Sequence, residues 1–207
     1  MSNATVTVCL APTPPGDVYG AIGKAMEPYA LNSEATSLAG REWDHWRIDA
    51  GDDRRYPVNP AFDGDPRLIY ADQWESTPNR KRLPLQCDGG PISLLDLDQM
   101  RINTADDARV EWNWRLGNPN VNVQPPAESL TVFIAARVQW AIATFALLTL
   151  DGLWIDPDTP GPFLDVLPDT TRTDAYDHQR AVHAREATRY IESLADDCII
   201  VQLRYHC

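Results

Sequence analysis

Hydrophobic side chains recur along this chain with two different periods, and the period predicts the element in each segment. Residues 5–11 and 198–205 are rich in β-branched and other apolar side chains, which is typical of strands. Beyond the prolines that follow residue 11, Asp17 is suited to cap a helix. The apolar residues of this predicted helix fall on one face: Val18, Ile22, Ala25, Met26 and Tyr29. The chain therefore opens with a strand and an amphipathic helix, and it closes with a strand.

The second half of the chain has a helix, hairpin and helix pattern. Residues 127–143 and 173–194 are predicted helices, and the first is expected to turn these residues inward: Val132, Ala135, Ala136, Gln139 and Ala143. Two hydrophobic runs, 145–150 and 153–156, flank Asp151-Gly152 between the helices. Asp-Gly is the favoured two-residue hairpin turn, because both positions require a positive φ. A β-hairpin is therefore the clearest local prediction.

The middle of the chain has a weaker pattern. Residues 42–48 predict a second strand, but prolines and Asn-rich turn signals interrupt residues 49–126. Short ordered pieces are expected at 67–70, 92–100 and 109–115. A structureless stretch of that length is uncommon unless it is functional.

The order of these elements predicts a single α+β domain over residues 1–207, with an irregular insertion at about 49–126. We expect a mainly antiparallel sheet with helices packed on one face. A ferredoxin-like core carrying the insertion is the specific hypothesis.

Charge and composition narrow the classes of partner. The formal charge of −12 repels phosphate backbones, so it disfavours direct binding to nucleic acids or anionic membranes. Arg137 near the centre of the most hydrophobic window, 130–150, disfavours a membrane span. The N-terminus carries no pattern of a secretion signal, which predicts a cytoplasmic protein with reduced thiols. The bias toward arginine over lysine indicates a high-GC, actinobacterium-like host.

The first candidate site is the segment around Trp43, Asp44, His45, Trp46 and Arg47. On a strand, Trp43, His45 and Arg47 would share one face, and Asp44 and Trp46 the other. Such a face suits a ligand, because a tryptophan stacks and the imidazole and guanidinium bind polar or anionic groups. The alternative is a tryptophan-rich strand that covers the core, with His45 and Arg47 in solvent or in salt bridges.

The second candidate site is the Cys87-Asp88-Gly89-Gly90 segment, where two glycines permit unusual backbone angles. A catalytic thiol would need a histidine and an electropositive setting, whereas Asp88 tends to raise the pKa of a neighbouring thiol. A structural turn is therefore the favoured interpretation of this segment.

Neither a metal nor a cofactor is predicted. His178 and His183 are five residues apart, which places them about 140° apart around a helix. Nucleotide-binding, serine hydrolase and zinc-protease motifs are absent from the sequence. The one dense basic run, 79–82, is expected to be a solvated loop.

Three sets of residues carry a resemblance to a group of actinobacterial and actinophage proteins. They are Trp43-Asp44-x-Trp46-x-Ile48, then Cys87-Asp88-Gly89-Gly90-Pro91 with Leu94-Leu95-Asp96, and Thr149-Leu150-Asp151-Gly152-x-Trp154. The chain resembles this group in short islands from the first strand to the last. It has Asp49-Ala50 where the group has Gly-Gly, and it lacks the Arg-Trp that follows. The resemblance implies a phage-borne context and no particular activity.

These observations favour a soluble, acidic binding or accessory protein. It would sequester a small ligand, such as a nucleotide signal, or inhibit a host protein. A ligand trap requires a concave pocket with exposed Trp and Arg, whereas an inhibitor that mimics nucleic acid requires carboxylates on one exposed face. One alternative is a small hydrolase or transferase that uses Asp44, His45 or Asp88 as acid or base. The other is a structural or virion-associated protein without a pocket.

Overall fold

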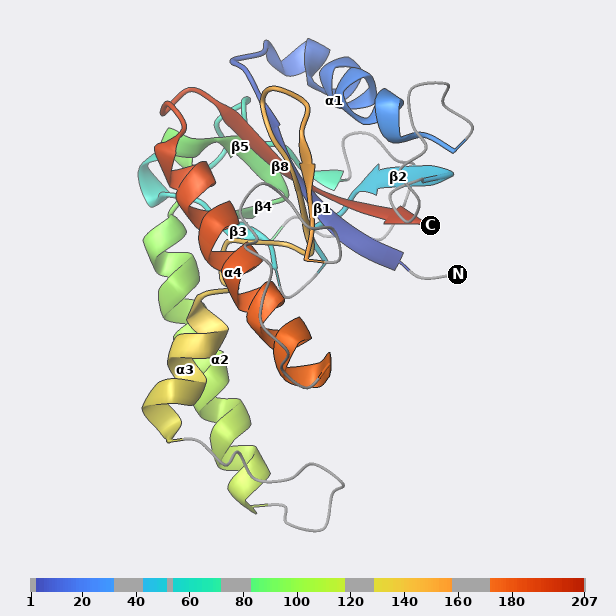
Figure 1. The fold of residues 1–207 in the computed structure, drawn as a ribbon. Coiled ribbons are helices and arrows are strands. Elements are labelled where there is room, and N and C mark those ends of the chain that lie inside the picture. The colour runs from blue at the N-terminus through green and yellow to red at the C-terminus, as the bar shows by residue number, and fades with distance from the viewer. Residues whose placement is uncertain are drawn as a thin grey trace.

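The computed structural model describes residues 3–31, 43–51, 54–71, 83–117, 129–157 and 172–206. A mixed, mainly antiparallel sheet lies at the centre, with helices around it (Figure 1). The helices are α1 (Val18–Met26), α2 (Leu97–Gly117), α3 (Leu130–Val138) and α4 (Arg172–Ser193). Short 3₁₀ helices cover Pro15–Asp17, Glu27–Tyr29, Pro60–Phe62 and Ile92–Leu94. This architecture confirms the predicted α+β class.

The two terminal strands form the centre of the sheet. Strands β1 (Asn3–Leu10) and β8 (Ile199–His206) pair antiparallel along their full length. On one side of this pair lie β6 (Ala146–Leu148), parallel to β1, and then β7 (Trp154–Ile155). On the other side, β2 (His45–Ile48) and β5 (Gly89–Pro91) both pair with β8. A separate two-stranded sheet joins β3 (Tyr56–Pro57) to β4 (Gln86–Cys87).

The predicted ferredoxin-like core is not confirmed. In the structure β6, the first strand of the hairpin, lies beside β1, and β7 lies at the edge. The helices also occupy both faces of the sheet. Helix α1 packs with Val6 and Val8 on one face, while Ala184 and Ile191 of α4 pack on the other. The buried strands carry apolar side chains on both faces, so each face needs a helical cover.

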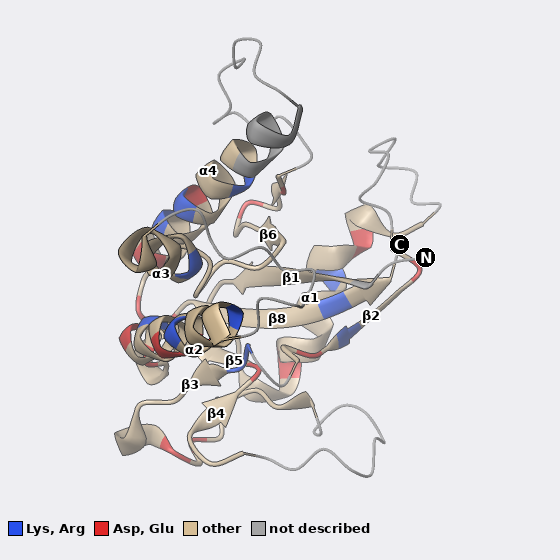
Figure 2. Cartoon of the chain, turned by 90° about the horizontal axis from the view of Figure 1, so that it is seen from below, with Lys and Arg blue, Asp and Glu red and all other residues tan. Residues whose placement is uncertain are grey.

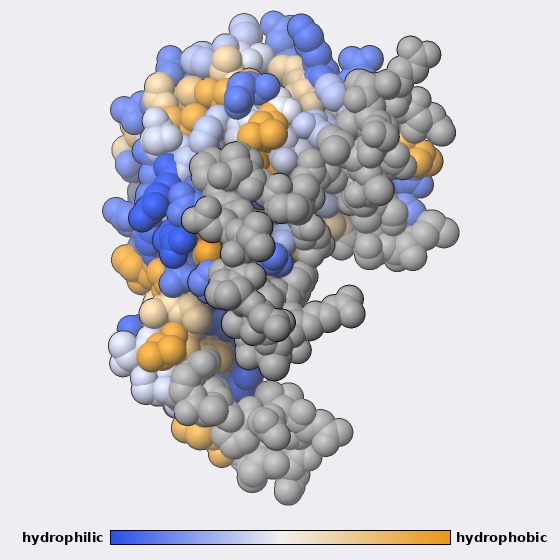
Figure 3. Space-filling model, in the orientation of Figure 1, coloured by the Kyte–Doolittle hydropathy of each residue, from blue (hydrophilic) through white to orange (hydrophobic). Residues whose placement is uncertain are grey.

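Helix α2 occupies much of the middle segment, which the sequence predicts to be irregular. It runs unbroken for 21 residues and lies beside α3 (Figure 1). Its buried residues are Met100 and Ala108, whereas Val110 and Trp114 are exposed. Apolar side chains on both the covered and the open side leave no helical period to detect. The space-filling view likewise shows hydrophobic and hydrophilic surface intermixed around α2 and α3 (Figure 3).

Helix α3 is shorter than predicted and faces inward differently. It begins after Ser129, whose Oγ accepts a hydrogen bond from the Val132 amide (3.4 Å), and ends at Val138. Phe133 is its buried residue, while these residues predicted to face inward are exposed: Val132, Ala135, Ala136 and Gln139. Helix α3 packs mainly against α2, and the Phe133 ring is the buried side chain of this contact instead of the expected wide apolar face.

The hairpin at residues 146–155 is confirmed, with Leu148 opposite Trp154. Its turn differs from the predicted one, because Gly152 has a positive φ (79°) and Asp151 does not. The Thr149 hydroxyl donates to the Asp151 carboxylate (2.6 Å), and the Thr149 amide donates to the Leu153 carbonyl. Helix α4 and strand β8 also lie where they are predicted. Within the described ranges, no helix combines the length and apolarity needed to cross a membrane.

Candidate functional site

The strand pattern predicted that Trp43 would share a face with His45 and Arg47. In the structure, Trp43 does not lie on that face. Its indole N–H donates to the Met26 carbonyl (3.0 Å), and its ring meets Trp46 edge to face with centroids 6.3 Å apart. Pairing of β2 with β8 begins only at His45, so strict alternation does not extend back to residue 43. Both tryptophans therefore pack toward α1, where Tyr19 covers Trp46.

The opposite face of β2 carries a network of charged side chains. Arg47 lies across from Arg204 of β8, and both guanidiniums face the carboxylate of Asp49, at 2.9 and 3.7 Å. Asp49 is fully buried, and its other oxygen accepts the Gly51 amide (2.8 Å). A buried carboxylate requires such partners to offset its desolvation. Asp49 thus acts as the counterion of two arginines.

Asp44 belongs to a separate, exposed pair. Its carboxylate lies 2.8 Å from Nδ1 of His206, and this hydrogen bond lowers the pKa of Asp44. His45 lies across from His206 in the β2–β8 register. The acid–base hypothesis requires Asp44, His45 and Asp88 around one cavity. Asp44 and His45 are exposed whereas Asp88 is buried, so the three are not assembled in this way.

Asp88 connects three segments of backbone. One oxygen of its buried carboxylate accepts the Ala50 amide (3.0 Å), and the other accepts the Ala71 amide (2.8 Å). The Arg55 guanidinium lies 3.8 Å away and is itself almost completely buried. The two accepted amides satisfy loop backbone that would otherwise be buried without partners. Asp88 thus has a structural role.

Cys87 and Gly89 are also explained by packing. Burial raises the pKa of the Cys87 thiol to about 12, so it stays protonated and is a poor nucleophile. A Cβ on Gly89 would lie 2.4 Å from the Ile200 carbonyl oxygen, because β5 approaches β8 closely. The segment forms strands β4 and β5 with a bend at Asp88, where the sequence predicted a turn, and it holds β5 against β8.

We expect Cys87 and Cys9 to resist alkylation in the native protein. Burial also raises the pKa of the Cys9 thiol to about 12. Iodoacetamide at about pH 8 should leave both unmodified, and should modify both once guanidinium unfolds the chain. Peptide mass spectrometry measures the modification of each cysteine. Rapid modification of Cys87 in the native protein would contradict this expectation and support a catalytic thiol.

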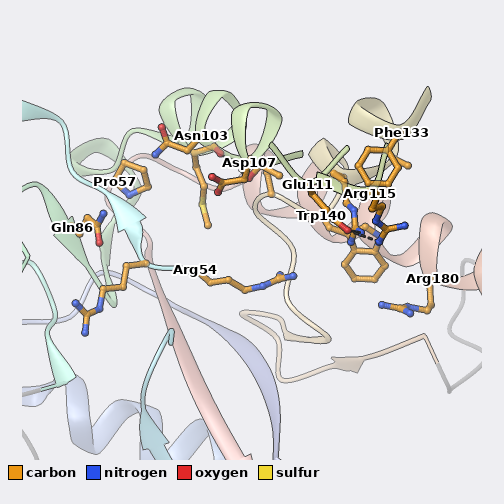
Figure 4. A pocket seen from close by; sticks show the side chains of 16 residues that line it. Arg54, Pro57, Gln86, Asn103, Asp107, Glu111, Arg115, Phe133, Trp140 and Arg180 are labelled. Carbon is orange, nitrogen blue, oxygen red and sulfur yellow. Dashed lines mark hydrogen bonds and ion pairs between the residues drawn. The ribbon is translucent and has the colours of Figure 1, made fainter. Parts of the chain in front are cut away.

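A groove that none of the predicted site residues lines is the candidate ligand site in the described part of the chain. It has a volume of about 1110 Å³ and lies between the segment before β3, helices α2 and α3, and α4 (Figure 4). Its charged and aromatic side chains are Arg54, Arg55, Arg115, Arg137, Arg180, Asp107, Glu111, Phe133 and Trp140. We call this the arginine groove.

The arginine groove differs in charge from the rest of the chain. Of the five arginines that line it, Arg55 faces the buried Asp88 carboxylate; the other four and the two carboxylates give a net charge of +2, whereas the chain carries −12. Cationic side chains gathered in a concave surface concentrate field lines and attract anions. The groove is thus a basic depression in an acidic protein.

One wall of the groove is built on Phe133, which is almost completely buried. The guanidiniums of Arg115 and Arg137 lie over its ring, 5.3 and 5.1 Å from the centroid. Both donate to the same carboxylate oxygen of Glu111, Arg137 at 2.8 Å. Cation–π contact and ion pairing together hold the two charges in place.

The other wall is built on Trp140. The Arg180 guanidinium lies 5.2 Å from its ring centroid, and the His183 ring lies 5.9 Å away. Burial lowers the pKa of His183, whose Nε2 lies 3.2 Å from the Thr144 carbonyl. Arg54, whose guanidinium donates to the Ala143 carbonyl (3.4 Å), points toward this wall (Figure 4). A planar indole and two guanidiniums therefore lie at one end of the groove.

The sequence gives only weak signals for these residues. Arg137 stands out in its apolar window, and Glu111 with Arg115 has the spacing of a helical ion pair. Arg54, Trp140 and Arg180 come from segments that only the fold brings together. The basic run at 79–82 lies outside the described residues.

No family model matches the chain, and comparisons with curated proteins and with solved structures found no match. The resemblance to actinobacterial and actinophage proteins therefore stays a prediction.

Proposed function

We propose that this protein binds a small anionic ligand in the arginine groove and acts by sequestering it. The observation that carries the proposal is the convergence of four arginines (Arg54, Arg115, Arg137 and Arg180) and Trp140 on one concave surface of a strongly acidic chain. Guanidiniums recognise phosphate and carboxylate groups through paired hydrogen bonds. A cytoplasmic accessory protein of phage or actinobacterial origin is part of this proposal.

A nucleotide is the ligand class that suits both walls. Its phosphates would contact the guanidiniums, and its base would lie against the Trp140–Arg180 end, where aromatic and cationic groups already stack. The groove is large enough for such a ligand, since small-molecule sites usually measure about 300–1,000 Å³.

The other hypotheses have less support. A carboxylate mimic of nucleic acid needs one acidic face, but basic and acidic side chains are interspersed along α2 and α4 (Figure 2). The acid–base set of Asp44, His45 and Asp88 is not gathered around the groove. A purely structural protein requires no groove of this charge.

The proposal is tested by calorimetric titration of the protein with ATP, sodium pyrophosphate and sodium malonate at low ionic strength. We expect saturable binding of one equivalent of at least one of these anions, weakened by added salt because screening reduces attraction between charges. If none binds at about 1 mM, the proposal is wrong.

A further inference from the structure

Glu111 occupies a position in the arginine groove that an anionic ligand would also favour. One of its oxygens accepts hydrogen bonds from Arg115 of α2 and from Arg137 of α3. Both guanidiniums lie over the Phe133 ring. A single carboxylate thus draws together two cations that would otherwise repel each other.

The Glu111 carboxylate is not buried. Its side chain is 35% exposed, and those of Arg115 and Arg137 are 23% and 45% exposed. An exposed carboxylate on a flexible side chain can leave its partners without the large desolvation penalty of a buried ion. The two guanidiniums, by contrast, keep their support from the ring beneath them.

We propose that Glu111 is a built-in competitor, which a phosphate group of the ligand displaces from Arg115 and Arg137. This inference rests on the proposed function and adds the ligand chemistry and its regulation. A phosphate group offers more negative charge and more acceptor oxygens than the carboxylate it replaces, whereas a ligand carboxylate only exchanges like for like. The protein therefore selects phosphate-bearing ligands over carboxylates, and Glu111 lowers their apparent affinity by occupying the site.

Titration of sodium pyrophosphate into Glu111→Gln tests the competition. We expect about tenfold tighter binding than in wild type, because the neutral amide holds the guanidiniums less strongly than the carboxylate. Asp107→Asn is the matched control. Asp107 lines the same groove one helical turn earlier and pairs with no arginine of the described chain. It should tighten binding by less than about threefold, through net charge alone.

Glu111→Asp provides a second test at unchanged net charge. Its carboxylate is one methylene farther from the guanidiniums, so pyrophosphate should again bind several times more tightly than in wild type. This variant also keeps the test decisive if the glutamine variant does not fold. Malonate affinity should rise less than pyrophosphate affinity in each variant.

The outcomes separate this inference from the proposed function. If wild type binds pyrophosphate but the Glu111 variants bind it no more tightly than Asp107→Asn, Glu111 is not a competitor. The groove then remains a binding site. Variants that bind more weakly than wild type also overturn it, because Glu111 then only positions the arginines. Wild type that binds none of the anions contradicts the proposed function itself.

Discussion

Replacing Asp88 by alanine is expected to lower the free energy of unfolding by about 3–5 kcal/mol. The carboxylate accepts the amides of Ala50 and Ala71 and lies beside the buried Arg55 guanidinium. Alanine would leave two buried donors and one buried charge without this partner, and each incurs its full desolvation cost. Urea denaturation followed by circular dichroism measures the change.

The matched control is Asp106→Ala. Asp106 is 63% exposed and pairs with Arg109 on the surface of α2. Exposed pairs of this kind contribute little, so the control should stay within about 0.5 kcal/mol of wild type. An Asp88→Ala protein as stable as this control would show that the carboxylate does not hold the segments together.

Gly89→Ala is expected to destabilise the fold by about 2–4 kcal/mol. The added methyl group would lie 2.4 Å from the Ile200 carbonyl oxygen and 2.7 Å from the Val201 Cα, both backbone atoms that cannot rotate away. Strand β5 would have to move off β8, which breaks their pairing. Thermal unfolding gives the readout.

Gly20→Ala gives a control of the opposite sign. Gly20 lies in α1, and a Cβ there would meet nothing within 4 Å. Alanine favours helix over glycine by roughly 0.5–1 kcal/mol, so this variant should be slightly more stable than wild type. If Gly89→Ala is tolerated equally well, the close approach of β5 to β8 is not a constraint.

The terminal strands, α4 and the hairpin could be predicted because each has a strong local signal. Val6, Val8, Ile200 and their neighbours form hydrophobic runs, and Asp151-Gly152 marks a turn. Helix α2 could not be predicted, because its apolar residues do not gather on one side. The face of Trp43 depended on where pairing with β8 begins, which residues 43–49 alone do not indicate.

The arginine groove lay beyond prediction for a different reason. Its charged and aromatic residues come from four separate parts of the chain, and each has an ordinary local explanation. Arg115 is a helical ion-pair partner of Glu111, and Arg137 follows an apolar stretch. Only tertiary packing of α2, α3 and α4 brings the guanidiniums together. The segments with the most distinctive sequence, around Trp43 and Asp88, turned out to hold the fold.

The arginine groove is tested most directly by titrating pyrophosphate into two double variants that lose the same charge. One is Arg137→Gln/Arg180→Gln. The other is Arg185→Gln/Arg189→Gln, whose exposed arginines lie on α4, outside the groove, and pair with Glu186. We expect the groove variant to bind at least about tenfold more weakly than wild type, and the control to stay within about twofold. Equal weakening in both variants would contradict a site in the groove.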